Sequence, residues 1–241
     1  MRVPIIRGVI DRRILINYRI EPSIVASLLP KPFRPKLVGG YGMAGVCLIR
    51  LKHIRPRFVP KAFGVGSENA AHRIAVEWDQ DGELREGVFI PRRDTSSRFN
   101  TLVGGRLFPG VHHHARFRVD EGDGHYKLKL DSDDEEAHLS VTGHDTDEWP
   151  SGSVFGSLNE ASEFFQRGSL GYSTTPDQKK FDGLELRSFN WSMTPLSVET
   201  VNSSYFQDHK SIPSDSITFD CALLMKNVDH EWHARQSICA I

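Results

Sequence analysis

The fold class is decided by residues 112–142, which read HHHARFRVDEGDGHYKLKLDSDDEEAHLSVT. Within 112–119, 126–130 and 137–142, apolar and polar residues alternate, which is the period of a β-strand with one buried face. Gly122-Asp-Gly124 separates the first two segments, and the polar run 131–136 separates the second and third. The stretch is therefore predicted to form a three-stranded antiparallel meander.

Strand patterns also dominate the rest of the chain, and helix patterns are few. Further strands are predicted over residues 41–53, 68–78, 87–90, 185–193, 197–206 and 217–227. One short helix is expected between Pro22 and Pro30, and another follows Ser157 and Glu160, which have the spacing of a capping box. We therefore expect a β-rich α+β fold, a single-domain, mostly antiparallel β-barrel or cone over residues 1–241, with a few short helices.

The charge of the chain is nearly balanced overall but strongly divided along its length. The 241 residues carry a net charge of -1, yet residues 1–118 hold 21 Lys and Arg against 9 Asp and Glu. Nucleic-acid binders usually couple such a basic cluster to an aromatic platform or a reading helix, and neither pattern is present. We expect the arginines to pair mainly with the acidic second half, and no nucleic-acid partner is predicted.

Cysteine usage and hydropathy bear on the compartment. Cys47, Cys221 and Cys239 are too few for a disulfide framework and fit a reducing cytoplasm. Arg7 and Asp11 interrupt the apolar N-terminal stretch too early for a signal peptide. No run approaches the ~18 apolar residues of a membrane-spanning helix. A cytoplasmic protein without a membrane partner is expected.

Alternation within the predicted strand 68–78 assigns side chains to its two faces. Glu68 and His72 share a face with Ile74, Val76 and Trp78, so this apolar face is predicted to point inward. A carboxylate buried alone is costly and needs a partner. Arg50, which lies in an otherwise apolar strand, is the predicted partner of Glu68 or a binding group for a ligand.

The histidine run at the start of the meander is assigned in the same way. His113 alternates with Ala115 and Phe117 and is predicted to point inward, whereas His112 and His114 belong to a polar face. Two histidines at i, i+2 could bind Zn²⁺, but no cysteine or carboxylate accompanies them at ligand spacing. His230 and His233 are spaced i, i+3 rather than the i, i+4 of a zinc-protease helix. No metal site is therefore predicted.

Several segments together resemble a known family. They are Glu21-Pro22 opening a helix that reaches Leu28-Leu-Pro30, Gly42-Met-Ala-Gly-Val-Cys-Leu48, Glu68-Asn-Ala-Ala-His-Arg73, Gly87-Val-Phe-Ile90 and Gly104-Gly-Arg-Leu-Phe-Pro-Gly-Val-His-His-His114. These segments resemble the YqjF-like bacterial family of unknown function, in the acetoacetate decarboxylase-like superfamily. The resemblance spans most of the chain and is densest over residues 20–120.

The resemblance implies a cone-like, mostly antiparallel barrel with a central cavity, and a homodimer. In acetoacetate decarboxylase a Gly-Phe-Pro-Lys-Lys run supplies the Schiff-base lysine. The matching stretch here is Gly110-Val-His-His-His114, so His113 stands where that lysine would be. An imidazole forms no stable imine with a keto acid, so the lysine mechanism does not carry over. Glu68 matches a cavity carboxylate of the decarboxylases.

These observations lead to a functional hypothesis with two alternatives. The hypothesis is a barrel that binds a small anionic organic molecule without a cofactor. Glu68 and His113 would form a non-covalent acid–base pair, with His72 nearby and Arg50 or Arg106 holding a carboxylate. One alternative is a non-catalytic binding or structural module with a packed interior. The other is a metal-dependent hydrolase that uses the histidine run.

Overall fold

The computed structural model describes residues 4–105, 108–208 and 210–240. The long strands are β1 (Ile6–Ile20), β4 (Tyr41–Pro56), β5 (Val65–Gln80), β6 (Glu83–Thr95), β7 (His112–Gly122), β8 (His125–Ser132), β9 (His138–Asp145), β10 (Leu170–Thr174), β11 (Lys180–Ser188), β12 (Thr194–Ser203) and β13 (Ile217–Cys239). The short elements are β2 (Arg34–Pro35), β3 (Leu37–Val38), α1 (Pro22–Leu28), α2 (Arg98–Val103), α3 (Leu158–Arg167), α4 (Ser204–Gln207) and 3₁₀ turns at Lys61–Phe63 and Ser214–Ser216.

The meander predicted from the alternating sequence is present as β7, β8 and β9. Val119 of β7 lies opposite Leu128 of β8, and Leu128 lies opposite Val141 of β9. These apolar residues share one face, and Leu128 and Val141 are almost completely buried. The register therefore follows the hydrophobic pattern, because a slip of one residue would expose the whole face.

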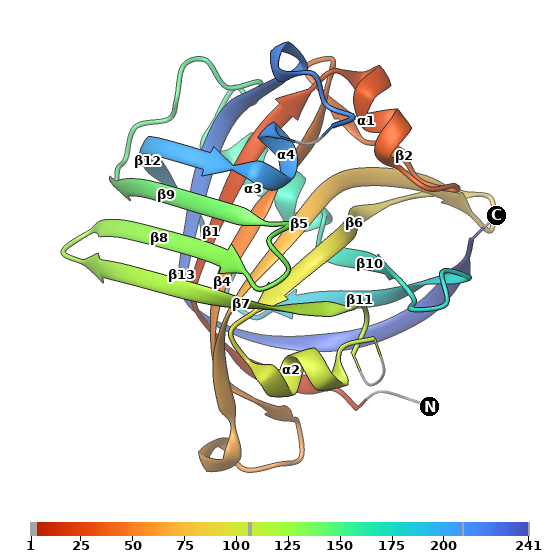
Figure 1. The fold of residues 1–241 in the computed structure, drawn as a ribbon, viewed down its shortest axis with the longest axis vertical. Helices are drawn as coiled ribbons and strands as arrows, with labels where there is room; N and C mark the ends of the chain where they lie inside the picture. Colours follow the sequence, from red (N-terminus) through yellow and green to blue (C-terminus); the bar gives the residue numbers. More distant parts are fainter. Residues whose placement is uncertain (1–3, 106–107, 209, 241) are drawn as a thin grey trace.

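The strands form one sheet that closes on itself in two ways (Figure 1). The first ring consists of β5, β6, β7, β8, β9, β12, β13, β1 and β4, and the β5–β6 pairing closes it. The second ring consists of β6, β10, β11, β13, β1, β4 and β5, and the β11–β13 pairing closes it. Only the β6–β7 and β6–β10 pairings of these described strands are parallel. The expected strand-rich, mostly antiparallel fold with few helices is confirmed.

Five strands (β13, β1, β4, β5 and β6) belong to both rings and form a wall between their interiors. Along β1, Ile14 and Ile16 belong to the hydrophobic cluster of the first ring, whereas Leu15 between them belongs to a second cluster. All three side chains are fully buried. The wall strands are therefore buried on both faces, which explains their continuous apolar runs.

The interior of the first ring is a packed hydrophobic core. Tyr18, Trp78 and Phe206 are among its largest buried side chains, and aliphatic residues of the meander fill the space between them. Phe33, which follows α1, packs edge-to-face against Trp78 with the ring centroids 5.5 Å apart. The packed interior that the sequence allowed as an alternative is thus found in this ring.

The α3 helix covers the second hydrophobic cluster. Ser157 Oγ accepts a hydrogen bond from the Glu160 amide (3.2 Å), as the capping pattern predicts. Glu160 itself bonds the amide of Gly156 rather than that of Ser157 (2.7 Å). Phe164 and Phe165 on the inner face are buried in the cluster. No helix within the described residues has the length and apolar character needed to cross a membrane.

Ion pairs join the basic first half to the acidic second half. Arg12 bonds Glu121 (2.7 Å), and Arg92 bonds Asp134 (2.8 Å) and Glu136 (3.0 Å). In each pair the arginine comes from before residue 119 and the carboxylate from after it. The divided charge of the sequence is thus partly neutralised inside the fold.

Candidate functional site

The second ring encloses a cavity of about 180 Å³. Every strand of that ring contributes to its lining, through Arg13, Cys47, Arg73, Arg93, Gly171, Leu184 and Trp232. The C-terminal end of α3 contributes Phe165, and Asn100 of α2 and the nearby Phe108 add further lining. Pockets for drug-sized ligands occupy about 300–1,000 Å³, so this cavity suits a smaller molecule.

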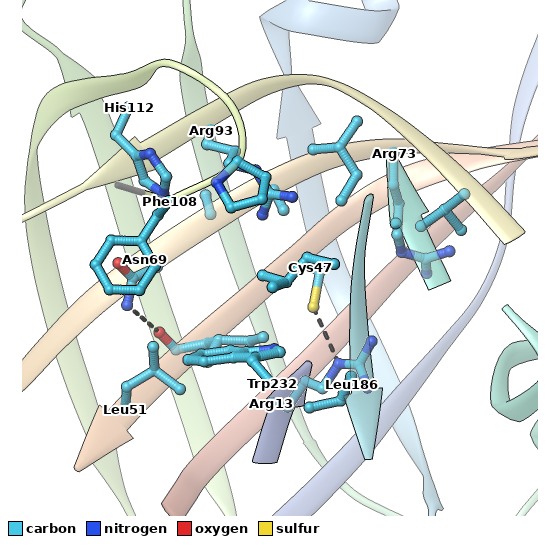
Figure 2. Close-up of a pocket in the computed structure, with 18 of the residues that line it drawn as sticks. Arg13, Cys47, Leu51, Asn69, Arg73, Arg93, Phe108, His112, Leu186 and Trp232 are labelled. Carbon is cyan, nitrogen blue, oxygen red and sulfur yellow. Dashed lines mark hydrogen bonds between the residues drawn. The ribbon is translucent and has the colours of Figure 1, made fainter. Parts of the chain in front are cut away.

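Three arginines line this cavity from three strands of the wall, β1, β5 and β6 (Figure 2). Arg13 donates to sulfur atoms of Cys47 (3.1 Å) and Met225 (3.8 Å). Arg73 donates to Asn17 Oδ1 (2.5 Å) and lies over the Phe165 ring. Arg93 Nε donates to Ser173 Oγ (3.2 Å).

None of these three guanidiniums forms an ion pair with a carboxylate of residues 4–105, 108–208 or 210–240. Burial lowers the pKa of Arg73 to about 10 and that of Arg93 to about 10. Both therefore stay protonated at neutral pH. The Nε of Arg73 is also buried without a hydrogen-bond partner. Buried charge without a counter-charge is costly, so the arrangement favours an anion in the cavity.

His112, the first residue of β7, adds an imidazole to the cavity lining. Its Nδ1 lies 3.0 Å from the carbonyl oxygen of Gly110. A carbonyl only accepts, so the neutral ring carries its proton on Nδ1 and has its lone pair on Nε2. Burial, reinforced by the charge of Arg93, lowers the pKa of His112 to about 4. The ring is therefore neutral at physiological pH.

Two glycines make room for these side chains. Gly110 has φ +82°, and a Cβ there would lie 2.9 Å from Ser173 Oγ and 3.0 Å from Arg93 Nε. A Cβ on Gly104 would lie 2.3 Å from His112 Nδ1. The loop before β7 thus sets the positions of both Arg93 and His112, and any larger residue would displace them.

The remaining lining combines a polar corner with an apolar wall. Asn69 donates to Ser67 O (3.1 Å) and accepts from Thr95 Oγ1 (2.8 Å), which fixes its amide. Leu51, Leu186 and Trp232 supply apolar surface (Figure 2). The cavity can therefore hold a molecule with an anionic end and a small apolar body.

Glu68 and Arg50 lie together, as the sequence predicts, but they do not line this cavity. Glu68 accepts hydrogen bonds from Arg50 Nε (2.5 Å) and Arg12 Nη2 (2.6 Å). Arg50 also pairs with Glu121. The two residues are directly opposite each other across β4 and β5. The prediction that Arg50 partners Glu68 is confirmed. The guanidinium of Arg50 forms ion pairs with Glu68 and Glu121 of the same chain.

His72 and His113 belong to a second charged cluster outside the cavity lining. His113 Nδ1 lies 2.8 Å from Asp134 Oδ2, and its side chain is about one-third exposed (36%). His72 is fully buried, and desolvation together with Arg92 lowers its pKa to about 3. Its 3.5 Å approach to Asp94 is therefore a contact of a neutral ring rather than an ion pair.

The sequence placed His113 on the inward face and His112 on the polar face, and it is His112 that lines this cavity. Alternation correctly put the two on opposite faces of β7, but both faces of this region point into the protein. The apolar face of β5 and β7 packs the first ring, whereas the face with more polar residues meets the cavity. The same reversal puts Arg73 and Asn69 of β5 in the cavity and Glu68 outside it.

The other sequence candidates are accounted for separately. Arg106 lies outside the described residues. His114 Nδ1 bonds Asp133 (2.7 Å), away from His112, so the two do not converge on one ion. His230 is buried, and His233 bonds Glu231 (3.0 Å). Among the described lining residues of the cavity none is a lysine.

The sequence over residues 10–217 matches the family model DUF2071, whose description is "Uncharacterized conserved protein". The chain belongs to the DUF2071 family. The match covers most of the chain, including β4, β5, β6 and the loop before His112, so the resemblance seen in the sequence is confirmed. No curated protein matches the sequence.

Solved structures show that this DUF2071 chain has the acetoacetate decarboxylase-like fold. The acetoacetate decarboxylase of Legionella pneumophila superposes with TM-score 0.56 at 13% identity, covering 96% of this chain and 87% of its own. An acetoacetate decarboxylase-like enzyme from Sphingomonas wittichii gives TM-score 0.58 at 11% identity, covering 99% and 93%. The enduracididine biosynthesis enzyme MppR complexed with pyruvate gives 0.59 at 10%, covering 100% and 91%. At these identities the likeness concerns the fold.

Proposed function

We propose that this protein binds a small organic carboxylate, of the size of a short 2-oxo acid, in the cavity of the second ring. The observation that carries the proposal is the set of Arg13, Arg73 and Arg93, which face one cavity without carboxylate partners among the described residues. A bound carboxylate would supply the missing counter-charge through charge-assisted hydrogen bonds. MppR, which shares the fold, has been captured with pyruvate, a ligand of this class.

The chemistry that the cavity supports is proton transfer without a covalent intermediate. Imine formation requires a primary amine, and the described lining offers none. The lone pair on His112 Nε2 can accept a proton from a carbon next to a carbonyl, and the arginines can stabilise the resulting enolate. The acid–base pairing of Glu68 and His113 stays a prediction for the other ring, where both groups already have partners.

Two broader inferences accompany this function. The single-domain organisation is supported by β1 and β13, which are the first and last strands and pair with each other from one end of β1 to the other. A reducing compartment such as the cytoplasm is supported by the three cysteines, all of which are free thiols.

The binding proposal is tested by calorimetric titration of pyruvate, with the neutral amide pyruvamide as the matched ligand. We expect pyruvate to bind and pyruvamide to bind at least tenfold more weakly. Arg93→Gln should abolish binding, whereas Arg116→Gln should retain it, because Arg116 is a largely exposed arginine of β7. Equal binding of acid and amide, or full binding by the Arg93 variant, would exclude the arginine site.

The chemical part of the proposal has its own measurement. Exchange of the pyruvate methyl protons in D₂O, followed by proton NMR, should be accelerated by the protein and lost in His112→Gln. Borohydride added to the mixture should leave the protein mass unchanged. Binding without any exchange would leave a binding protein rather than an enzyme, and a mass increase at a lysine would overturn the non-covalent chemistry.

A further inference from the structure

A separate cluster of metal-ligating side chains lies on β8, β9 and β12, in the part of the first ring that is not shared with the second. His125 is the first residue of β8, and His144 lies near the end of β9. The two are directly opposite in the β8–β9 register, and their ring centroids are 5.8 Å apart. Directly opposed residues of an antiparallel pair project from the same sheet face, so the backbone holds both imidazoles on one side.

A break in strand pairing brings a carboxylate to the same place. The register between β9 and β12 shifts between Val198 and Thr200, so Glu199 is an extra residue without a pairing partner. Such bulges redirect a side chain. Glu199 Oε1 lies 3.2 Å from His144 Nδ1. Figure 1 shows β8, β9 and β12 as neighbours in the sheet. Each of these strands contributes one side chain to the cluster: His125, His144 and Glu199 respectively.

We propose that His125, His144 and Glu199 form a binding site for a divalent transition metal ion, with Zn²⁺ as the reference ion. Among the described residues this group offers one ligand atom from each side chain, all within 4.8 Å of one another. Zinc bonds to nitrogen and oxygen measure about 2.0–2.2 Å, which requires the atoms to approach further. His125 and Glu199 are exposed and His144 partly so, hence small side-chain rotations close the gap.

The donor set indicates which ions the site takes. Two imidazoles and one carboxylate favour Zn²⁺, Ni²⁺ or Cu²⁺ over Mg²⁺ or Ca²⁺, which prefer oxygen ligands. Three protein ligands at an exposed position leave the fourth position to water. The ion would link three strands of the first ring, and because it binds the folded state it would raise the thermal midpoint.

The histidine run 112–114 is another place where a metal ion could bind, so the experiment must distinguish it from the proposed site. His112 lies in the cavity and His114 bonds Asp133, so neither contributes to this site. His138 provides a matched control, because it is an exposed histidine of the same strand β9 and also pairs with a carboxylate, Asp131 (3.2 Å).

The test is a zinc titration of the full chain, prepared without a histidine tag, against a chromophoric chelator at pH 7.5. We expect one equivalent to bind, with at least a tenfold loss of affinity in His144→Gln, His125→Gln or Glu199→Gln and none in His138→Gln or His114→Gln.

The visible spectrum of the Co²⁺-loaded protein gives an independent readout of geometry. Intense bands typical of four-coordinate Co²⁺ should appear in the unsubstituted chain and vanish in His144→Gln. The thermal midpoint of each metal-free variant should match that of the metal-free parent, since the altered side chains are on the surface. Absence of stoichiometric binding, or binding that survives in His144→Gln, would overturn the site.

Discussion

Replacement of Arg73 by methionine should make the ligand-free protein more stable and abolish ligand binding. Burial lowers the pKa of Arg73 from its ordinary value to about 10, which corresponds to a cost of about 3 kcal/mol for keeping the charge in the folded state. The cost applies in full at neutral pH, because the folded and unfolded chains are both protonated there. Methionine fills a similar volume without a charge.

The lost hydrogen bond offsets part of this gain. Arg73 donates to Asn17 Oδ1, and an unsatisfied buried acceptor costs about 1–3 kcal/mol. The net expectation for Arg73→Met is therefore an increase of about 0–2 kcal/mol in the free energy of unfolding, by difference of these two contributions. Such a gain in stability with a loss of function is typical of sites built to hold a ligand.

Urea denaturation with and without pyruvate measures both effects in one assay. The parent should gain stability with ligand concentration, by mass action, and the variant should not. Arg116→Met is the control, because a substitution of an exposed side chain changes stability by at most about 0.5 kcal/mol. If Arg73→Met is less stable than the parent and still responds to pyruvate, Arg73 is a structural cation rather than part of a ligand site.

Further expectations concern the imidazole, the loop and the wall. In an NMR titration His112 should show a pKa of about 4, and pyruvate should raise it, because an anion favours the charged ring; an unchanged value would place the anion elsewhere. Gly110→Ala should lower the free energy of unfolding by about 1–2 kcal/mol, because residue 110 has a left-handed backbone conformation that disfavours alanine. The substitution should also weaken pyruvate binding. Melting curves and calorimetry measure the two effects, and unaltered binding would contradict the role of the loop. Leu15→Ala should cost about 2–5 kcal/mol in urea denaturation, since the side chain is fully buried in the wall; a cost below about 1 kcal/mol would mean that the wall repacks.

Much of the fold could be predicted from residues 112–142 and from the resemblance carried by residues 20–120. The alternation in the meander specifies its register, because only one pairing buries Leu128 and Val141. Alternation also correctly separated Glu68 from Asn69 and His112 from His113. The double closure of the sheet could not be predicted, because it depends on pairings such as β11–β13 between segments far apart in the chain.

The cavity was missed for a related reason. Apolar content indicates which face of a strand is buried. From the sequence alone, the candidate functional residues are therefore placed on the more apolar face. In β5 both faces are interior, and the more apolar one is the packed core. The available signal was Arg73, a charged residue between Ala71 and Ala75 on the same face of the strand. An arginine in such a position indicates a cavity more strongly than a carboxylate beside a ready partner such as Arg50.

Because the two rings share a wall, different segments of the chain form the packed core and the rest of the cavity lining. Substitutions on the meander side of β1, β4 and β5 act on a solid core, where volume changes are poorly tolerated. The other boundaries of the cavity are β10, β11, the end of α3 and the loop before β7, and none of these segments belongs to the first ring. Related chains could therefore exchange one ligand for another by altering these short segments, while the core that keeps them folded is inherited unchanged.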